Sequence, residues 1–310
     1  MLCDSAIYMI YFLAISTTNR LATAIAQDDS YEKQKIISHG LGIATVLGMA
    51  ISLSTCLFGK RLLYWIVGGP TVTDIAGMSA ASVLQSAYTY CVIRSLAATA
   101  SVVGMVAQAI CLASLDMKTP TLAVLVASTC NMLGDFLLCS VWKLGSNGAA
   151  AATALATVAS AMVLLSSTRK TFRESHQTMM LEQSSSSQHE NTRSPPPFIS
   201  LPDKKSFLQL FQLAGPIAFV MMGKIVCYNA MTLKANMLGM VTMTAHSIML
   251  RVFFFFGTFA DSLSQAAQTF FPGILYGNTD DESSTSGSVA SETTEDKANG
   301  AYIKQFTFRL

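Results

Sequence analysis

The sequence predicts an all-α protein that crosses a membrane several times. Of its 310 residues, 51% are hydrophobic and only 12% are charged, about half the charged fraction of an average soluble domain. The mean hydropathy is +0.45. Much of the charge lies in three patches, Arg20–Lys35, Arg169–Lys205 and Asp280–Lys297, with long apolar stretches between them. Together these observations predict a polytopic helical bundle, because a helix that crosses the hydrocarbon core needs about 20 mostly apolar residues.

Seven segments are long and apolar enough to be membrane helices. The expected helices are Ala6–Ala26, Ile36–Gly68, Met78–Leu115, Thr119–Trp142, Gly145–Ser167, Phe207–Leu238 and Thr242–Tyr276. The third is long for a single span. The fifth consists almost entirely of small residues and carries no charge, which predicts close packing against its neighbours, because small side chains let helix backbones approach one another.

Two polar stretches divide the chain. We expect an N-terminal lobe at 1–168, a polar linker at 169–205, the start of a C-terminal lobe at 206–278 and a disordered tail at 279–310. Both polar stretches are too poor in apolar residues to bury a core, and the tail ends in a short apolar segment that resembles the start of another helix. Basic residues gather in the linker and in the loops after the first and third helices. The positive-inside rule therefore favours a cytoplasmic linker.

Composition also excludes several classes of function. A net charge of +2 gives no reason to expect a nucleic-acid partner. The seven Cys have no CxxC or metal-ligand spacing and the four His are scattered, so we expect no metal, no cofactor and no enzymatic activity. The expected partners are the lipid bilayer and a small organic solute. The sequence does not decide the oligomeric state.

A weak internal repeat relates the first and last expected helices. The segment Phe12–Gln27 aligns with Phe255–Phe270 after a shift of 242 residues, which pairs Asn19 with Asp261 and Ala24 with Ala266. Many transporters are built from duplicated helix bundles. The repeat therefore suggests that these two helices are equivalents in two halves of a transporter.

Several longer stretches occur together in an order typical of one family. They are FLAISTTNRLATAIAQDD, YCVIRSLAATASVVGMVAQAICLASLDMKTP, NMLGDFLLC with GSNGAAAATALATVASA, QLAGPIAFVMMGKIVCY, and TAHSIMLR with DSLSQAAQTFFPGILYG. These stretches resemble helices two, four, five and six, seven, and eight of the multidrug and toxic compound extrusion (MATE) transporters. The resemblance covers roughly residues 11–277 and is closest to the plant plastid-type branch.

The resemblance implies a MATE-like bundle of twelve helices in two lobes of six, of which this chain holds the equivalents of helices two to eight. It further implies multidrug or xenobiotic efflux by an antiporter, and a chain that is either a partial gene model or a divergent product. The plastid envelope follows only from the branch. The sequence itself predicts a multi-pass membrane protein and does not decide which membrane holds it.

Asp135 lies in the middle of an apolar segment of membrane length. An ionisable group at that depth costs several kcal/mol and normally faces a cavity or a partner. Burial raises the pKa of a carboxylate, which suits a group that holds and releases protons. An interhelical hydrogen-bond anchor is the alternative. Asn131 lies one turn earlier on the same face and could bond to Asp135. The family has an aspartate at this point, implicated in proton coupling in some members.

Lys224 departs from the family pattern. The eighth position after the proline of family helix seven is often a glutamate that helps to bind the coupling cation, and here Pro216 is followed at that distance by Lys224. A lysine repels cations, so the resemblance favours H⁺ over Na⁺ as the coupling ion. Lys224 could attract an anionic solute, or it could snorkel or pair with Asp261.

Four further residues complete the expected site. Arg94 could form an ion pair with Asp135, whereas Asp261 is better explained by structural pairing. Gln108 and Gln265 could line a polar cavity, although glutamine also joins helices in membrane bundles. The leading hypothesis is a proton-coupled antiporter that exports an organic solute, with an organic anion favoured by Lys224. The alternatives are a seven-helix membrane receptor and a MATE fragment that does not transport.

Overall fold

A computed structural model describes residues 7, 10–67, 80–185, 197–200 and 204–276, and the regular structure in these ranges is helical. The elements are α2 (Tyr11–Ala26), α3 (Ser30–Val67), α4 (Ala80–Leu96), α5 (Ala98–Ala113), α6 (Lys118–Asp135), the π-helix η2 (Phe136–Val141), α7 (Gly145–Ser185), α8 (Lys204–Met237) and α9 (Met240–Tyr276). The expected all-α bundle is confirmed.

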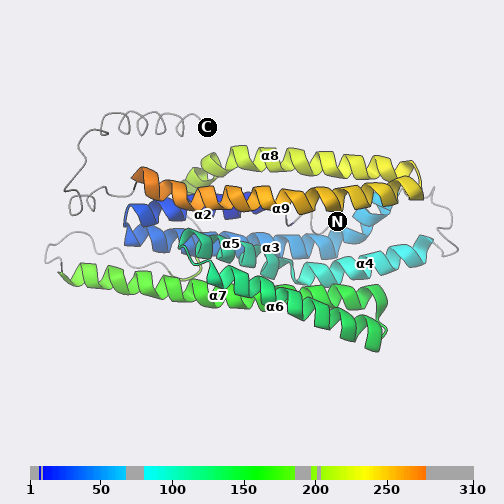
Figure 1. Ribbon diagram of the computed structural model, residues 1–310, viewed down its shortest axis with the longest axis horizontal. Helices are drawn as coiled ribbons and strands as arrows, with labels where there is room; N and C mark the ends of the chain where they lie inside the picture. The colour runs from blue at the N-terminus through cyan, green and yellow to red at the C-terminus, as the bar shows by residue number, and fades with distance from the viewer. Residues whose placement is uncertain (1–6, 8–9, 68–79, 186–196, 201–203, 277–310) are drawn as a thin grey trace, which may run out of the picture.

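The helices lie along the long axis of the molecule (Figure 1). Helices α6 and α7 pack against each other on one side, and α8 and α9 lie on the opposite side. Between these pairs, α2, α3 and α5 enclose the main core, whose members include Leu13, Leu21, Leu41 and Val106, each about 1% exposed. Helices α8 and α9 therefore approach the rest of the described bundle mainly through α2.

Small residues bring the helices of this bundle close together. A Cβ atom added to Gly134 on α6 would lie 2.8 Å from the Cβ of Ala152 on α7. Ala150 and Ala152 are fully buried. The close packing expected for the small-residue segment Gly145–Ser167 is thus confirmed. It stabilises the bundle through van der Waals contact, since lipid tails leave little hydrophobic drive for helix association.

Fewer helices meet the length of a membrane span than the seven expected. Within the described residues, five helices are long and apolar enough, or six when one bent pair is counted as a span. The expected helix Met78–Leu115 is that pair: α4 and α5 meet at Ala97 with a bend of 42°. Helix α2 has only 16 described residues. A multi-pass membrane protein is confirmed, and the first expected helix, Ala6–Ala26, lies partly outside the described residues.

The bend between α4 and α5 forms without a proline. A backbone carbonyl group at the bend accepts a hydrogen bond from a side chain of α3. The Ser52 hydroxyl donates a hydrogen bond to the carbonyl oxygen of Ser95 at 2.5 Å. Directly after the bend, α3 approaches so closely that a Cβ on Gly48 would lie 2.6 Å from the Cα of Thr99. The break in the third segment is therefore a tertiary feature, satisfied by a neighbouring helix.

Helix α7 continues into the segment expected to be a polar linker. Helix α7 continues to Ser185, and Phe172 is 8% exposed within the main core. The first part of the expected linker is thus helical, because its Arg, Lys, Glu, Gln and Met residues are good helix formers despite their polarity. Residues 197–200 are described and contact the bundle. The remainder of the linker, 186–196 and 201–203, and the expected tail at 279–310 lie outside the described residues.

The basic loops gather at one end of the molecule. The α2–α3 turn, the α5–α6 loop and the C-terminal end of α7 lie together there (Figure 1). Two contacts support this: Ser167 on α7 donates a hydrogen bond to Asp116 at 3.0 Å, and Ser200 lies 2.7 Å from Ser38 between hydroxyl oxygens. This shared end is called the linker end below. Its cytoplasmic orientation stays a prediction.

Candidate functional site

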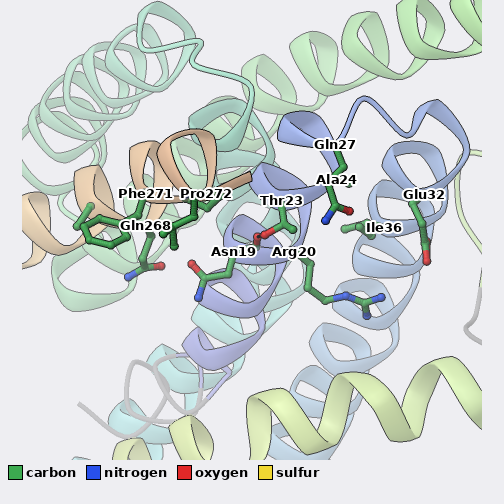
Figure 2. A pocket seen from close by; sticks show the side chains of 12 residues that line it. Asn19, Arg20, Thr23, Ala24, Gln27, Glu32, Ile36, Gln268, Phe271 and Pro272 are labelled. Carbon is green, nitrogen blue, oxygen red and sulfur yellow. Dashed lines mark hydrogen bonds between the residues drawn. The ribbon is translucent and has the colours of Figure 1, made fainter. Parts of the chain in front are cut away.

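A cleft of about 580 Å³ opens between α2, α3 and α9 at the linker end. Figure 2 shows Asn19 and Gln268 approaching it from α2 and α9, while Arg20 extends toward α3. Its lining combines amide, hydroxyl and charged groups with an apolar wall. The residues are Asn19, Arg20, Thr23, Ala24, Gln27, Glu32, Ile36, Ala267, Gln268, Phe271, Pro272 and Leu275. Apolar walls with a few polar groups are typical of small-molecule sites.

The two charged side chains of the cleft, Glu32 and Arg20, differ in whether they form an ion pair. Glu32 forms an ion pair with Lys35 at 3.3 Å. Among the described residues, no ion pair to Arg20 is found. Lys35 thus pairs with one oxygen of Glu32, while Glu32 Oε2 is buried without a hydrogen-bond partner among the described residues. The guanidinium of Arg20 is the group of the cleft able to bind an anion in bidentate fashion.

A smaller cavity of about 40 Å³ lies deeper, where α2, α5 and α9 meet. Gln108 and Gln265, both expected to line a cavity, contribute to it together with Tyr11. The amide of Gln265 donates a hydrogen bond to the Tyr11 hydroxyl at 2.8 Å. Gln268 lines this cavity as well as the cleft. Gln268 thus lies between the cleft and the smaller cavity, at the junction of α2 with α9.

Asp135 and Asn131 form a separate pair on α6, in contact with α7. The Asn131 amide donates a hydrogen bond to Asp135 Oδ2 at 3.3 Å, as the spacing predicts. Asp135 Oδ1 and Asn131 Oδ1 are buried and have no hydrogen-bond partner in the part of the chain that the structure describes. The π-helix η2 begins at the next residue, Phe136. Single π-turns inside membrane helices often accompany functional sites.

The remaining expected residues do not join these groups. Lys224 and Asp261 are exposed on α8 and α9, and no ion pair between them is found in the described structure. Arg94 is half-buried near the end of α4, while the Asp135 carboxylate bonds to Asn131 instead. The two ion pairs that the sequence left possible, Arg94 with Asp135 and Lys224 with Asp261, are not found among the described residues.

Sequence reasoning missed most of the cleft. Arg20, Thr23 and Gln27 lie at the end of an apolar helix, where charge and polarity resemble an ordinary loop boundary. The internal repeat did single out Asn19, by pairing it with Asp261. Only the packing of α9 against α2 shows that these polar residues face an opening.

Comparison with known proteins gives a consistent result. No protein-family model matches the chain. The chain is 30% identical to Protein DETOXIFICATION 47, chloroplastic, of Arabidopsis thaliana over 279 residues, which are 89% of this chain and 45% of that protein. The chain thus spans about half the length of this relative.

Solved structures show the same fold. A MATE transporter of Vibrio cholerae in the bent form matches with a TM-score of 0.63 at 17% identity, over 88% of this chain and 56% of that one. An outward-facing multidrug resistance MATE family transporter of the MOP superfamily gives 0.61 at 13% identity, over 88% and 54%. A MOP superfamily transporter from Pyrococcus furiosus gives 0.61 at 15% identity, over the same shares. The MATE-like bundle is confirmed, and the fold disfavours the seven-helix receptor.

Proposed function

We propose that this chain, which belongs to the MATE family, acts in a secondary active antiporter that exports an organic solute in exchange for protons. The observation that carries the proposal is the cleft between α2, α3 and α9, because it lies where the two expected lobes meet. A site at such a junction opens first to one side of the membrane and then to the other as the two lobes rock against each other.

The lining of the cleft favours an organic anion with an apolar body. Phe271, Pro272 and Leu275 supply an apolar wall, and Arg20 lines the same cleft without an ion pair among the described residues. Arginine binds carboxylates in bidentate fashion. Lys224 adds positive charge on α8, outside the cleft. Arg20 therefore supports an anionic solute more strongly than Lys224 does.

Protons are the proposed coupling ion, with Asp135 as the group that carries them. Its Oδ1 and the Oδ1 of Asn131 are buried acceptors without donors. A buried acceptor without a donor is destabilising, and protonation of Asp135 would create a donor within this pair. Protonation would also remove a charge from membrane depth. The lysine at position 224 opposes a cation such as Na⁺ at the site where many family members hold one.

The same relatives bear on class and location. They are transporters, which supports a protein of transport rather than of catalysis. The chloroplastic relative supports the plastid envelope as the membrane. A MATE fragment without transport of its own is the alternative, and reconstitution of the chain decides between the two.

The test is proton-driven flux through the full-length gene product in proteoliposomes. Asp135→Asn is expected to abolish the dependence of export on a pH gradient, because the amide cannot take up a proton. Asp28→Asn is the matched control, since Asp28 is exposed in the α2–α3 turn. Unchanged pH-driven flux in Asp135→Asn would refute the role of Asp135, and a wild-type protein without flux would refute the transport proposal.

A further inference from the structure

The short segment Pro197–Ser200 is bound to α3 by hydrogen bonds. The Ser38 hydroxyl donates to the carbonyl oxygen of Pro197 and lies 2.7 Å from the Ser200 hydroxyl. The Ser200 amide lies 3.4 Å from the Ser38 carbonyl oxygen, to which it donates. Ser38 is fully buried. A polar side chain at such a position needs partners, and the segment provides them.

An aromatic contact binds the same segment to α7. The ring of Phe198 meets the ring of Phe172 edge to face, with centroids 5.2 Å apart. The guanidinium of Arg169 lies 5.6 Å from the centre of the Phe198 ring, within cation–π range. Three residues of this segment, Pro197, Phe198 and Ser200, thus contact α3 and α7 through hydrogen bonds, ring packing and a cation.

Because few residues separate the attached segment from α8, the attachment restrains the position at which α8 begins. Helix α8 begins at Lys204, four residues after Ser200. Four Cα-to-Cα links of 3.8 Å reach at most about 15 Å, whatever path they take. Counted instead from Ser185, the end of α7, the nineteen links to Lys204 would reach about 72 Å. Only the attachment of Pro197–Ser200 makes the connection short.

A restraint on the start of α8 acts on α9 as well. The two helices pack through Tyr228, whose ring centroid lies 5.4 Å from that of Phe254, and through Thr232, 3.3 Å from the ring nitrogen of His246. Helix α9 forms one wall of the cleft. These contacts lie near the α8–α9 turn and join the two helices into one pair. The attached segment and the cleft are both at the linker end, so a limit on the start of α8 limits how far this pair moves away from α2.

We propose that Pro197–Ser200 is a strap that ties the α8–α9 pair to α3 and α7 and limits how far the cleft opens at the linker end. Release of the strap allows the α8–α9 pair to swing away from α2. The strap thus sets which side of the membrane the cleft faces more often. It goes beyond the proposed transport activity and does not depend on the identity of the solute.

A disulfide trap tests whether the strap is attached. Ser38→Cys with Ser200→Cys is placed in a background whose seven native cysteines are replaced, with a protease site inserted between residues 186 and 196. After oxidation and cleavage, the two fragments are expected to stay joined on a non-reducing gel. The control pair is Ser38→Cys with Ile199→Cys, because the side chain of Ile199 is 55% exposed. Equal or absent cross-linking in the two pairs overturns the proposal.

A distance measurement tests whether the strap restrains the cleft. Spin labels at Asp28 and Ile274, both exposed, report the separation of the α2–α3 turn from the end of α9 in nanodiscs. Phe198→Ala is expected to add a population at longer distance, and Ile199→Ala is expected to leave the wild-type distribution. The same distribution in all three proteins overturns the proposal. Neither measurement uses transport, so failure of the proposed antiport leaves both results readable.

Discussion

Arg20 illustrates how much a single residue in the cleft is expected to contribute. Replacing it with glutamine removes the unpaired guanidinium while keeping a polar side chain of similar length. A hydrogen bond to a charged group contributes about 1.5–3 kcal/mol, so we expect binding of 2-naphthoate to weaken by roughly 10- to 100-fold. Isothermal titration calorimetry of the purified chain measures this affinity.

Lys33→Gln is the control for Arg20→Gln. Lys33 is a cation of the same end, but it pairs with Asp28 at 2.7 Å and is not part of the cleft lining. Binding should change little in this variant. An equal loss in both variants would show that general positive charge, rather than Arg20, attracts the anion.

Asp116 is a second residue whose role can be measured, and it was missed by sequence reasoning. It accepts hydrogen bonds from the amides of Lys118 and Thr119, both at 3.2 Å, and from Ser167 on α7. The Thr119 hydroxyl, foremost, and these other donors hold the pKa of Asp116 below its usual range, although partial burial opposes them. The carboxylate therefore caps α6 and joins it to α7.

Asp116→Ala is expected to lower stability by about 1 kcal/mol, as is typical for loss of a helix cap. Because the folded-state pKa is depressed, the contribution of Asp116 is complete above the unfolded-state pKa of about 3.9. It is lost as the pH falls through the folded-state value. The melting temperature of the variant should thus fall below that of wild type at pH 7, and the difference between the two proteins should be smaller at pH 3. Glu174→Ala, in an exposed pair with Lys170, is the control.

Whole helices are positioned by close contacts at small residues, and the crossing of α3 with α5 is the sharpest case. Gly48→Ala would place a methyl group 2.6 Å from the Cα of Thr99, a backbone atom that cannot move aside. Overpacking of this kind costs about 1–3 kcal/mol. We expect a lower melting temperature in detergent.

The same helix offers a matched control for this substitution. A Cβ on Gly59 would meet its nearest neighbour at 3.5 Å, an ordinary contact. Alanine also favours the helix by about 0.5–1 kcal/mol over glycine. Gly59→Ala should therefore be neutral or stabilising. Similar destabilisation in both variants would contradict the close crossing at Gly48.

At the scale of the whole molecule, a hydrogen bond between Gln265 and Tyr11 joins α9 to α2. Tyr11→Phe removes the acceptor of Gln265, worth about 1 kcal/mol. Amide exchange in α9 is then expected to accelerate about fivefold, while α7 keeps its wild-type rate. Tyr90→Phe, on α4, is the control. Equal exchange in α9 for both variants would show that the bond does not hold the two parts together.

The sequence by itself determined the class of this protein. Long apolar segments with few charges are stable in a membrane as a bundle of helices. Each helix satisfies its own backbone hydrogen bonds, and lipid offers no other partners. The small residues of Gly145–Ser167 likewise specified close packing. The Asn131–Asp135 contact followed from local spacing alone, since residues four apart on a helix share a face.

Tertiary structure decided the rest, because the remaining features depend on which helices meet. The bend at Ala97 needs a donor from α3, and the cleft exists only where α9 packs near α2. Lys224 and Asp261, a possible pair by sequence, form no ion pair among the described residues. The effective length of the linker also depends on tertiary contacts. The attachment of Pro197–Ser200 to α3 and α7 shortens the connection to α8, which composition alone predicts to be long and unattached.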